Sequence, residues 1–469
     1  MYRKFYLSLS LLAGLILFVF MGIAGYKEMT PEWAGYQQRY NKVMVEKASD
    51  AAMRKKAGNL KVHLQQIYLK DLKRVDRCVN CHAGSENPLM AEAKIPFRQH
   101  SGDYLKHHPP ERFGCTICHN GQGRALGVRE AHARGHDVHW DRPLIPFEFI
   151  QSSCALCHDP GTIKGQGGHK VASGRKLFLE RGCQGCHKLD GVGGVLGKAL
   201  DDVGSQPVAY FPMKRVEGEK TVYAWMKEHF DDPRNIVMGS EMLANLSDRE
   251  AEFLTTYVLS LRSDEVPKKY RSFQRARGDE PSGEEGESLY KMFCVACHST
   301  GTDSIYDEVF KRTIPAIMNP AFLSAADDNY LRTVLAEGRA DTPMTAWKKD
   351  AAGLTATQID KILAYITRNR PEKKPQPFGL AGYAGNVRHG EQLYKIRCIS
   401  CHGEKGQGGV GLNLRNPVVQ KAAFEFLAIT IRDGRDGTHM APFGKQGVGL
   451  QNPDIADLVA YVKTLGTKK

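Results

Sequence analysis

The sequence predicts a mostly α-helical protein with much irregular structure: a transmembrane helix, a loop-rich segment and three copies of a helical unit. Three observations predict this class. An uncharged run opens the chain, a five-residue motif occurs six times, and three stretches carry apolar residues at three- and four-residue spacing. In chain order we expect a transmembrane anchor at 1–27, a helical stalk at 28–75, a segment with three motifs at 76–170, and helical units at 171–263, 284–371 and 386–469.

The first segment is an uncharged run of 22 residues from Phe5 to Tyr26, preceded by Arg3 and Lys4. At about 1.5 Å per residue, a helix of that length spans the roughly 30 Å hydrocarbon core of a bilayer. A cleaved signal peptide is the alternative, but its apolar core is usually about 7–15 residues long and ends in a small-residue cleavage site. We favour an uncleaved anchor. Positive residues at its start predict a cytoplasmic N-terminus, a single pass through the inner membrane, and a periplasmic remainder.

The residues 28–75 that follow contain no motif, and Glu32 to Arg74 is predicted to be mainly a charged helix.

The repeated motif is Cys-x-x-Cys-His, and its six copies use all twelve cysteines. This pattern attaches a c-type haem: both thiols bond to the porphyrin and the histidine binds the iron. Zinc sites, thioredoxin-like motifs and structural disulfides do not require a histidine after every second cysteine. We therefore expect six covalent haems, held by Cys78, Cys81 and His82; Cys115, Cys118 and His119; Cys154, Cys157 and His158; Cys183, Cys186 and His187; Cys294, Cys297 and His298; and Cys398, Cys401 and His402.

The net charge of the chain is +13, which by itself would favour an anionic partner such as nucleic acid. Six haems, however, bring roughly twelve propionate groups that offset most of this charge. No run of Lys and Arg is interleaved with aromatic residues. We therefore expect no nucleic-acid partner.

Histidines outside the motifs are concentrated around the first three motifs, whereas Met90 is the one methionine between Arg77 and Lys170. Bis-histidine ligation is therefore expected for the first three haems. Our leading distal ligands are His100, His108 and His132, and the sequence does not indicate which of them binds which iron. The pool from which they are drawn is His63, His100, His107, His108, His132, His136, His139 and His169.

The three helical units from residue 171 onward share one plan. Each opens with a short helix before its motif, has a methionine in a loop, and closes with an amphipathic helix that contains a tyrosine. Ser247 and Thr355 are predicted N-caps, because their hydroxyls can accept a bond from a first-turn N–H. The closing helices are expected at Ser247 to Arg262, Thr355 to Arg370 and Asn452 to Gly466, with Tyr257, Tyr365 and Tyr461.

This plan resembles the class I cytochrome c domain, in which two crossing helices hold one haem between a motif histidine and a loop methionine. The resemblance implies that His187, His298 and His402 are proximal ligands. It further implies that the distal ligands are Met242, Met344 and Met440. Some features depart from the family pattern. Met242 and Met344 lack the proline that commonly follows the ligand methionine. Met238 is near enough in sequence to Met242 to be an alternative ligand, and His439, next to Met440, is an alternative ligand of the last iron.

Covalent haems in close succession suit stepwise electron transfer. Since a Met ligand raises the potential, we expect low-potential haems near the anchor and high-potential haems in the last three units. The anchor, the three-motif segment and the class I domains together resemble multihaem cytochrome subunits of bacterial quinol-oxidising complexes, of the Rieske/cytochrome b or the alternative complex III type. That resemblance implies a polytopic membrane subunit that oxidises quinol, a Rieske or other iron–sulfur protein as a further candidate partner, and a soluble cytochrome or terminal reductase as acceptor.

Two other functions stay open. A multihaem reductase of a small oxidant such as nitrite or peroxide would need an iron with an open axial position, whereas candidate ligands outnumber the haems here. A self-assembling polymer of cytochromes is disfavoured by the anchor and by linkers at about 264–284 and 371–386.

Overall fold

The chain divides into two compact units, and each is described by itself. The computed structural model describes residues 2–133, 140, 142–242, 246–263, 266–272, 285–308, 312–340, 342–372, 374–380, 383–435 and 438–466. The first unit comprises Met1–Asp159, Gln206–Lys227 and Asp264–Phe273, and the second comprises Pro160–Ser205, Glu228–Ser263 and Gln274–Lys469.

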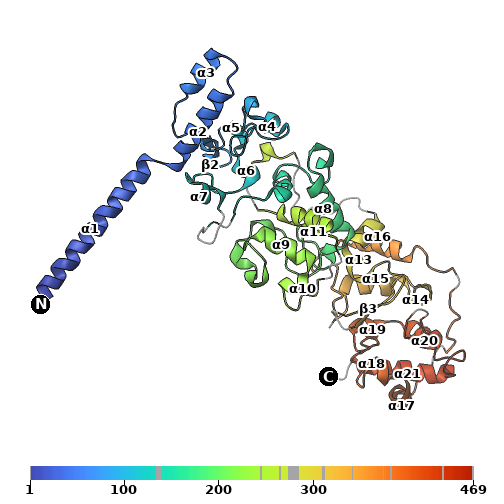
Figure 1. Ribbon diagram of the computed structural model, residues 1–469. Helices are drawn as coiled ribbons and strands as arrows, with labels where there is room; N and C mark the ends of the chain where they lie inside the picture. Colours follow the sequence, from blue (N-terminus) through green and yellow to red (C-terminus); the bar gives the residue numbers. More distant parts are fainter. Residues whose placement is uncertain are drawn as a thin grey trace. The chain divides into compact units, whose positions relative to one another are not determined.

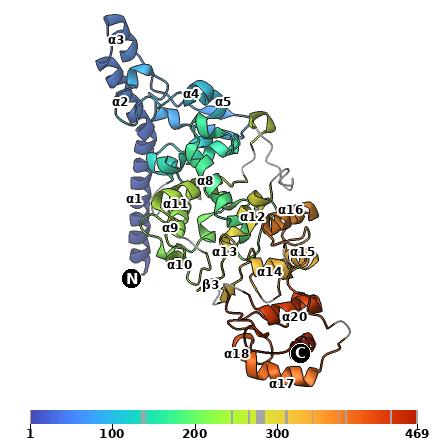
Figure 2. The same cartoon turned by 90° about the vertical axis from the view of Figure 1, so that its right-hand side faces the viewer.

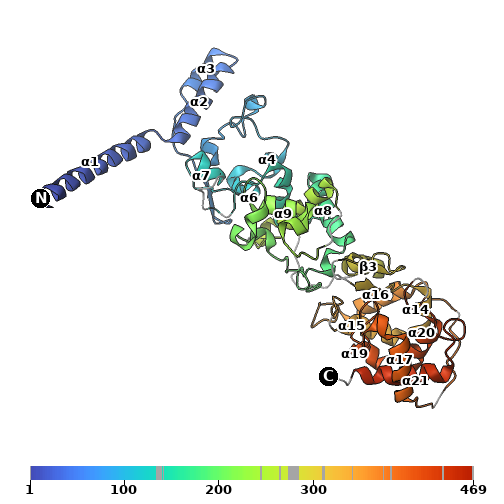
Figure 3. The same ribbon diagram turned by 60° about the horizontal axis from the view of Figure 1, so that its bottom comes forward.

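The first unit begins with α1 (Tyr2–Met29), a helix of 28 residues. None of its most apolar stretch is buried against the rest of the structure, and the helix projects as a straight rod (Figures 1 and 3). Its length and composition suit a membrane crossing, a test that a signal sequence also passes.

After α1, the predicted helix from Glu32 to Arg74 is only partly present. The helices α2 (Glu32–Glu46) and α3 (Ala51–Gly58) pack together, but the chain is not helical beyond Gly58. It continues into a two-stranded antiparallel sheet of β1 (Ile67–Leu69) and β2 (Arg74–Asp76).

The reason for this difference lies in side chains that bind the backbone of the extended segment. Buried Gln37, on α2, donates to the carbonyl of His63 and accepts from its N–H, at 2.9 and 3.0 Å. Asn80 accepts from the Gln65 N–H and donates to the Gln65 carbonyl. These bonds satisfy backbone groups that would otherwise bond within a helix.

The rest of the first unit is built from short elements, as the sequence predicted. Its α-helices between residues 76 and 159 are four or five residues long. Its elements are η1 (Cys78–Asn80), η2 (Pro88–Met90), α4 (Tyr104–His107), α5 (Pro110–Phe113), α6 (Thr116–His119), α7 (Val128–His132), η3 (Phe147–Leu156), η7 (Val208–Tyr210), η8 (Met213–Arg215) and η9 (Lys268–Tyr270).

The second unit contains longer helices. Helix α9 begins in the part of the chain assigned to the first unit and ends in the second. The elements are η4 (Ile163–Gln166), α8 (His169–Glu180), η5 (Cys183–Gly185), η6 (Val203–Ser205), α9 (Val222–Asp231), α10 (Pro233–Ile236), α11 (Asp248–Leu259), α12 (Gly286–Phe293), α13 (Val295–His298), β3 (Ile305–Asp307), β4 (Arg312–Ile314), α14 (Pro320–Ala325), α15 (Asp328–Glu337), α16 (Ala356–Thr367), α17 (Val387–Arg397), α18 (Ile399–His402), α19 (Pro417–Lys421), α20 (Phe424–Asp433) and α21 (Asn452–Leu465).

Three helix pairs in this unit repeat one crossing: α8 with α11 (Figure 1), α12 with α16 (Figure 2), and α17 with α21 (Figure 3). At each crossing the first helix carries a glycine. A Cβ at Gly174, Gly286 or Gly390 would lie 2.0 to 2.2 Å from a carbonyl oxygen of the partner helix, so no larger residue fits. Beside each glycine an aromatic pair closes the contact, with ring centroids 5.2 to 5.3 Å apart: Phe178 with Tyr257, Tyr290 with Tyr365, and Tyr394 with Tyr461.

The closing helices begin where the sequence predicted. Ser247 and Thr355 cap α11 and α16, and each forms a capping box with the residue three positions later, Glu250 and Gln358. Both helices end three residues earlier than expected, at Leu259 and Thr367.

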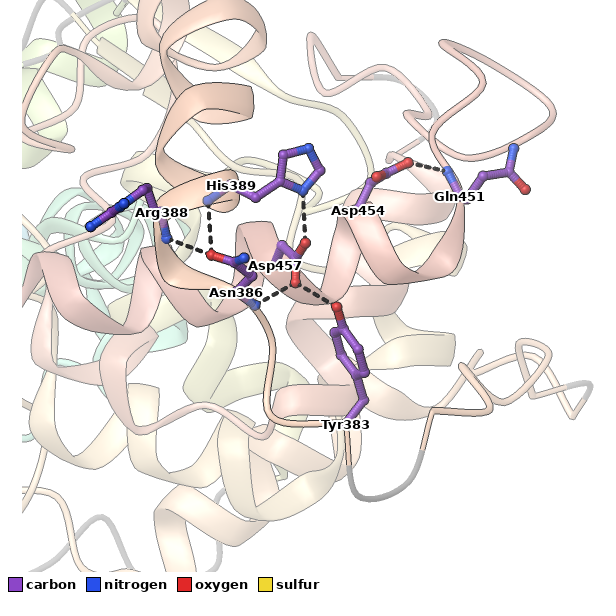
Figure 4. A network of polar contacts seen from close by, with 7 residues as sticks. All are labelled: Tyr383, Asn386, Arg388, His389, Gln451, Asp454 and Asp457. Carbon is purple, nitrogen blue, oxygen red and sulfur yellow. Dashed lines mark hydrogen bonds and ion pairs between the residues drawn. The ribbon is translucent and has the colours of Figure 1, made fainter.

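A buried carboxylate joins the last helix pair (Figure 4). Asp457, on α21, accepts hydrogen bonds from the Tyr383 hydroxyl at 3.0 Å, the Asn386 N–H at 2.5 Å and His389 Nδ1 at 2.8 Å. Burial opposes ionisation, but these hydrogen bonds hold the pKa of Asp457 below its ordinary value. Because Asn386 caps α17, the network fixes the start of that helix against α21.

The last two helix pairs share one hydrophobic core. Phe426 of α20 packs against Tyr330 of α15 with ring centroids 4.5 Å apart, and against Phe322 of α14 at 6.3 Å. Asn416 donates to the carbonyl of Ala340 at 3.0 Å. The shared core positions the fifth and sixth motifs relative to each other.

Candidate haem sites

All six Cys-x-x-Cys-His motifs adopt the same single turn. In each, the histidine N–H donates to the carbonyl of the first cysteine at 2.9 to 3.0 Å, and the second cysteine N–H donates to it at 3.1 to 3.2 Å. None of the twelve cysteines, all of which lie in the described residues, is in a disulfide bond. Each motif therefore presents two thiols and one imidazole from one turn of chain, the donor set that covalent attachment of haem requires.

The alternative uses of these side chains find no support in the described residues. There, no three His, Cys, Asp or Glu side chains converge as a zinc or other metal site would require. Burial raises the pKa of the Cys183 and Cys294 thiols to about 12, so these sulfurs stay protonated at neutral pH.

The three motif histidines of the second unit are oriented by backbone carbonyls. Nδ1 of His187, His298 and His402 lies 2.7, 3.3 and 2.8 Å from the carbonyl oxygens of Lys198, Pro315 and Leu412. Because a carbonyl only accepts, Nδ1 must carry the proton, and Nε2 is left as the nitrogen that can bind iron.

Glycines allow the chain to pass close to two of these rings. A Cβ at Gly197 would lie 2.3 Å from the ring of His187, and one at Gly411 would lie 2.9 Å from that of His402. Burial lowers the pKa of His187 and His402, and lowers that of His298 to about 4. The imidazoles are therefore neutral at physiological pH, as an iron ligand must be.

In the first unit, each motif histidine faces a second histidine. The ring centroids are 6.3 Å apart for His82 and His132, 6.1 Å for His119 and His100, and 5.9 Å for His158 and His108. Two imidazoles that bind one metal ion from opposite sides at about 2.0 Å have centroids roughly 6 Å apart. The three distal candidates from the sequence therefore lie at the separation that an iron atom between the rings would need.

Other members of the histidine pool lie elsewhere. His63, His107 and His169 are exposed, and Nδ1 of His63 contacts the carbonyl of Lys61 at 3.2 Å. His136 and His139 lie outside the described residues.

Two of the expected methionine ligands lie in one repeated loop, Gly-Arg-x-x-Thr-x-Met, that directly follows α15 and α20. In the first copy the Arg339 N–H donates to the carbonyl of Met344 at 2.9 Å, and the Met344 N–H donates to Thr342 Oγ1 at 3.2 Å. The second copy has the same bonds, from Arg435 to Met440 at 2.8 Å and from Met440 to Thr438 at 3.1 Å.

The glycine that opens each loop is in the left-handed region, with φ of +65° at Gly338 and +69° at Gly434. A side chain there would be strained, and its Cβ would meet backbone atoms at 2.6 Å. His439, beside Met440, is exposed.

The loop before α11 differs from these two. Met242 donates its N–H to Ser240 Oγ at 3.2 Å, and no arginine occupies the start of this loop. Met238, the competing methionine, is 75% exposed.

His229, which the sequence analysis missed, is a second candidate ligand at this site. Burial, and then the neighbouring His187, lower the pKa of His229 to about 4. The residue is the eighth of the ten in α9, and the eighth residues of α15 and α20, Leu335 and Ile431, face the shared core. The sequence did contain a signal for this candidate ligand: the other two units have an apolar residue at the position that His229 occupies.

Two partly buried arginines lie beside the fifth and sixth sites. Arg339 donates to the Tyr330 hydroxyl at 3.3 Å, and its Nη1 is buried without a hydrogen-bond partner. Arg435 lies over the ring of Phe322 at 4.7 Å, and burial lowers its pKa to about 10. Burial is the main cause of the lowered pKa values of His298 and His402, and the charges of Arg339 and Arg435, respectively, lower them further. Partly buried guanidinium groups beside the motif histidines suit the propionate carboxylates of haem.

Comparison with known proteins identifies cytochrome c domains from residue 171 onward. The family model for cytochrome c matches residues 171–262, and that for cytochrome c oxidase, cbb3-type, subunit III matches residues 281–366 and 385–462. These domains bind haem c covalently.

Among curated proteins, the Cbb3-type cytochrome c oxidase subunit CcoP of Azospirillum sp. (strain B510) is 27% identical over 203 residues, which cover 39% of this chain and 62% of that protein. The protein of the same name from Azospirillum brasilense is 26% identical over 201 residues, with the same coverage of each chain. Cytochrome c oxidase subunit 2 of Alkalihalophilus pseudofirmus is 30% identical over 91 residues, 19% of this chain and 25% of that protein. The chain thus spans about three fifths of the CcoP proteins that it matches.

Among solved structures, a chain of the Kuenenia stuttgartiensis reducing HAO-like protein complex aligns with 39% of this chain and 96% of its own, at 19% identity and a TM-score of 0.29.

Proposed function

We propose that this multihaem c-type cytochrome is a membrane-anchored hexahaem carrier that moves electrons from a quinol-oxidising membrane partner to an acceptor at its C-terminal domains. Haem c, when bound, supplies a one-electron iron couple whose potential depends on axial ligands, nearby charge and burial. The observation that carries the proposal is that six motifs form turns closed by the same two hydrogen bonds, each of which offers two thiols and one histidine.

Axial ligands follow from the pairs of side chains described above. His132, His100 and His108 are proposed to oppose His82, His119 and His158, which is supported by ring separations near 6 Å. The proposed distal ligands of the last three sites are Met242, Met344 and Met440. For the last two, the support is the repeated loop that fixes each methionine beside an arginine of its own site.

These ligand sets predict a gradient of potential along the chain. Bis-histidine sites in the first unit would have the lower potentials, and His/Met sites in the second unit the higher ones. Arg339 and Arg435 act in the same direction at the last two sites, because a nearby positive charge favours the reduced iron. Electrons are therefore proposed to enter near the anchor and to leave through the last domains.

The location and the partners are proposed from the anchor and the relatives. Helix α1 would hold the chain in the inner membrane with the haem domains on the periplasmic side. The matched relatives carry the names of oxidase subunits, which makes a terminal oxidase a candidate acceptor beside a soluble cytochrome. A polytopic quinol-oxidising subunit, with or without an iron–sulfur protein, is the proposed donor.

Extraction of the native protein in a mild detergent tests this function. We expect an intact mass with six haems, co-purification with a polytopic membrane subunit, and rapid haem reduction by a menaquinol analogue. A protein that emerges alone, ignores quinol and consumes nitrite or peroxide when reduced would instead be a reductase. A mass with fewer than six haems would contradict the hexahaem assignment.

A further inference from the structure

The fourth and fifth motifs lie directly against each other within the second unit, where η5 packs on α12 and α13. Two glycines of the fourth motif region allow this approach. Gly182 has a φ of +70°, and a Cβ there would lie 2.8 Å from the backbone N of Ala296. A Cβ at Gly185 would lie 2.8 Å from the carbonyl oxygen of Phe293 and 3.7 Å from the Cβ of Ala296. Larger residues would hold the two motifs apart.

The approach ends in a contact between two thiols. Cys297, the second cysteine of the fifth motif, lies beside Cys186, the second cysteine of the fourth. The sixth motif lacks such a neighbour among the described residues: its third residue, Ser400, is exposed, whereas Gly185 and Ala296 occupy the equivalent positions at the contact.

Attachment of haem keeps these sulfurs at the edge of each porphyrin. A thioether forms when the S–H of a cysteine adds across a vinyl group: the sulfur bonds to the carbon next to the ring, the hydrogen goes to the outer carbon, and no oxidant or reductant is consumed. Each sulfur is then separated from the macrocycle by a single carbon atom.

We propose that Cys186 and Cys297 form the electron-transfer contact between the fourth and fifth sites, where the thioether-bearing edges of two haems meet. This inference rests on the proposed function, because it requires haem at both motifs. The contact would carry the electron from the cytochrome c domain of the fourth motif to the two domains of the fifth and sixth motifs, which share one hydrophobic core. In the first unit Cys78 and Cys115, the first cysteines of the first two motifs, also lie near each other.

The fifth and sixth sites do not meet in this way. Arg339 and Arg435, from the two repeated loops, lie near His298 and His402, and each lowers the pKa of its own motif histidine. The contact at Cys186 and Cys297 is therefore specific to one junction of the second unit, and a side chain inserted there should leave the next junction intact.

The test uses the full-length holoprotein in detergent. It introduces larger side chains at the contact without changing any cysteine or histidine. Ala296→Leu and the milder Gly185→Ala insert atoms at the contact from either side, and Ser400→Leu places the same bulk at the matched position of the sixth motif. Circular dichroism in the Soret region and electron paramagnetic resonance of the oxidised protein report coupling between neighbouring haems. Intact mass reports the number of haems in each variant.

We expect Ala296→Leu to lose one coupled pair from both spectra at an unchanged mass of six haems, Gly185→Ala to lose part of that signal, and Ser400→Leu to match the wild type. Unchanged coupling in both Ala296→Leu and Gly185→Ala, with all haems attached, would contradict the proposed contact but not the proposed function. A wild-type mass without haem on the fourth or fifth motif would overturn both.

Discussion

The imidazole of His119 faces that of His100 with ring centroids 6.1 Å apart and ring planes at 73° to each other. His119 belongs to the second motif, whereas His100 lies in an irregular segment that precedes it. Nδ1 of His100 contacts the carbonyl of Ser101 at 2.9 Å, so Nε2 is again the nitrogen available for iron. The separation of the two rings is the one that a bis-histidine site would need.

Removal of the distal imidazole should therefore expose one iron. We expect His100→Ala to convert one of the low-spin haems to a high-spin form, which electron paramagnetic resonance at low temperature would detect. The matched control is His107→Ala, since His107 is exposed and near His108 in sequence but has no motif histidine opposite it. An unchanged low-spin count in His100→Ala would contradict the assignment.

Replacement of the methionine ligand of the sixth site by histidine should lower the potential of that haem, because a Met ligand raises the potential relative to His. We expect Met440→His to shift one of six steps in a redox titration downward and to remove one His/Met charge-transfer band from the near-infrared spectrum. Met238→Leu is the control, because Met238 is 75% exposed. If the titration of Met440→His superimposes on that of the wild type, Met440 is not a ligand.

The fourth site has two candidate distal ligands, and one pair of variants separates them. We expect Met242→Leu to remove a His/Met band and His229→Leu to leave the number of such bands unchanged. The opposite pattern, with Met242→Leu silent and a bis-histidine signal lost in His229→Leu, would assign His229 as the ligand. The near-infrared spectrum distinguishes these outcomes, because each ligand set has its own charge-transfer energy.

The positive charge of Arg435 beside His402 should raise the potential of the sixth site. We expect Arg435→Leu to lower that potential by tens of millivolts, since about 1.4 kcal/mol corresponds to about 59 mV for a one-electron couple. Arg435→Lys keeps the charge and should recover most of the difference in a titration followed by optical spectroscopy. A potential that stays constant in the leucine variant would show that this charge is fully screened.

The carboxylate of Asp457 should stabilise the last domain (Figure 4). Since it accepts three hydrogen bonds while 4% exposed, we expect Asp457→Asn to reduce the free energy of unfolding by about 1.5–3 kcal/mol at neutral pH. Asp454→Asn, one turn earlier on α21, is the control and should cost less, because Asp454 is partly exposed. Chemical denaturation followed through the haem absorbance measures both.

The pH dependence of that difference has a definite sign. The folded-state pKa of Asp457 lies below its unfolded value, so its stabilisation is fully present above the unfolded pKa of about 3.9. The stabilisation is lost as the pH falls through the folded value. The wild type and Asp457→Asn should therefore converge in stability in acid, and a gap that widens below pH 4 would contradict the network.

The sequence by itself determined the features that depend on neighbouring residues. The turn of Cys-x-x-Cys-His closes through hydrogen bonds within five residues, and the caps at Ser247 and Thr355 act over three, so both can be recognised from spacing alone. The prediction that the helix continues to Arg74 was wrong because this segment depends on distant residues. Side chains from α2 and η1 bind its extended backbone after Gly58.

The partners of each site were decided by tertiary structure alone. His100 faces His119, and Cys186 meets Cys297, because packed turns without any sequence period bring distant residues together. Arg339 and Arg435 lie beside the last two sites because α15 and α20 share one core. Spacing records which residues can hold haem, since those contacts are local. It does not record which sites become neighbours, because that depends on contacts between segments far apart in the chain.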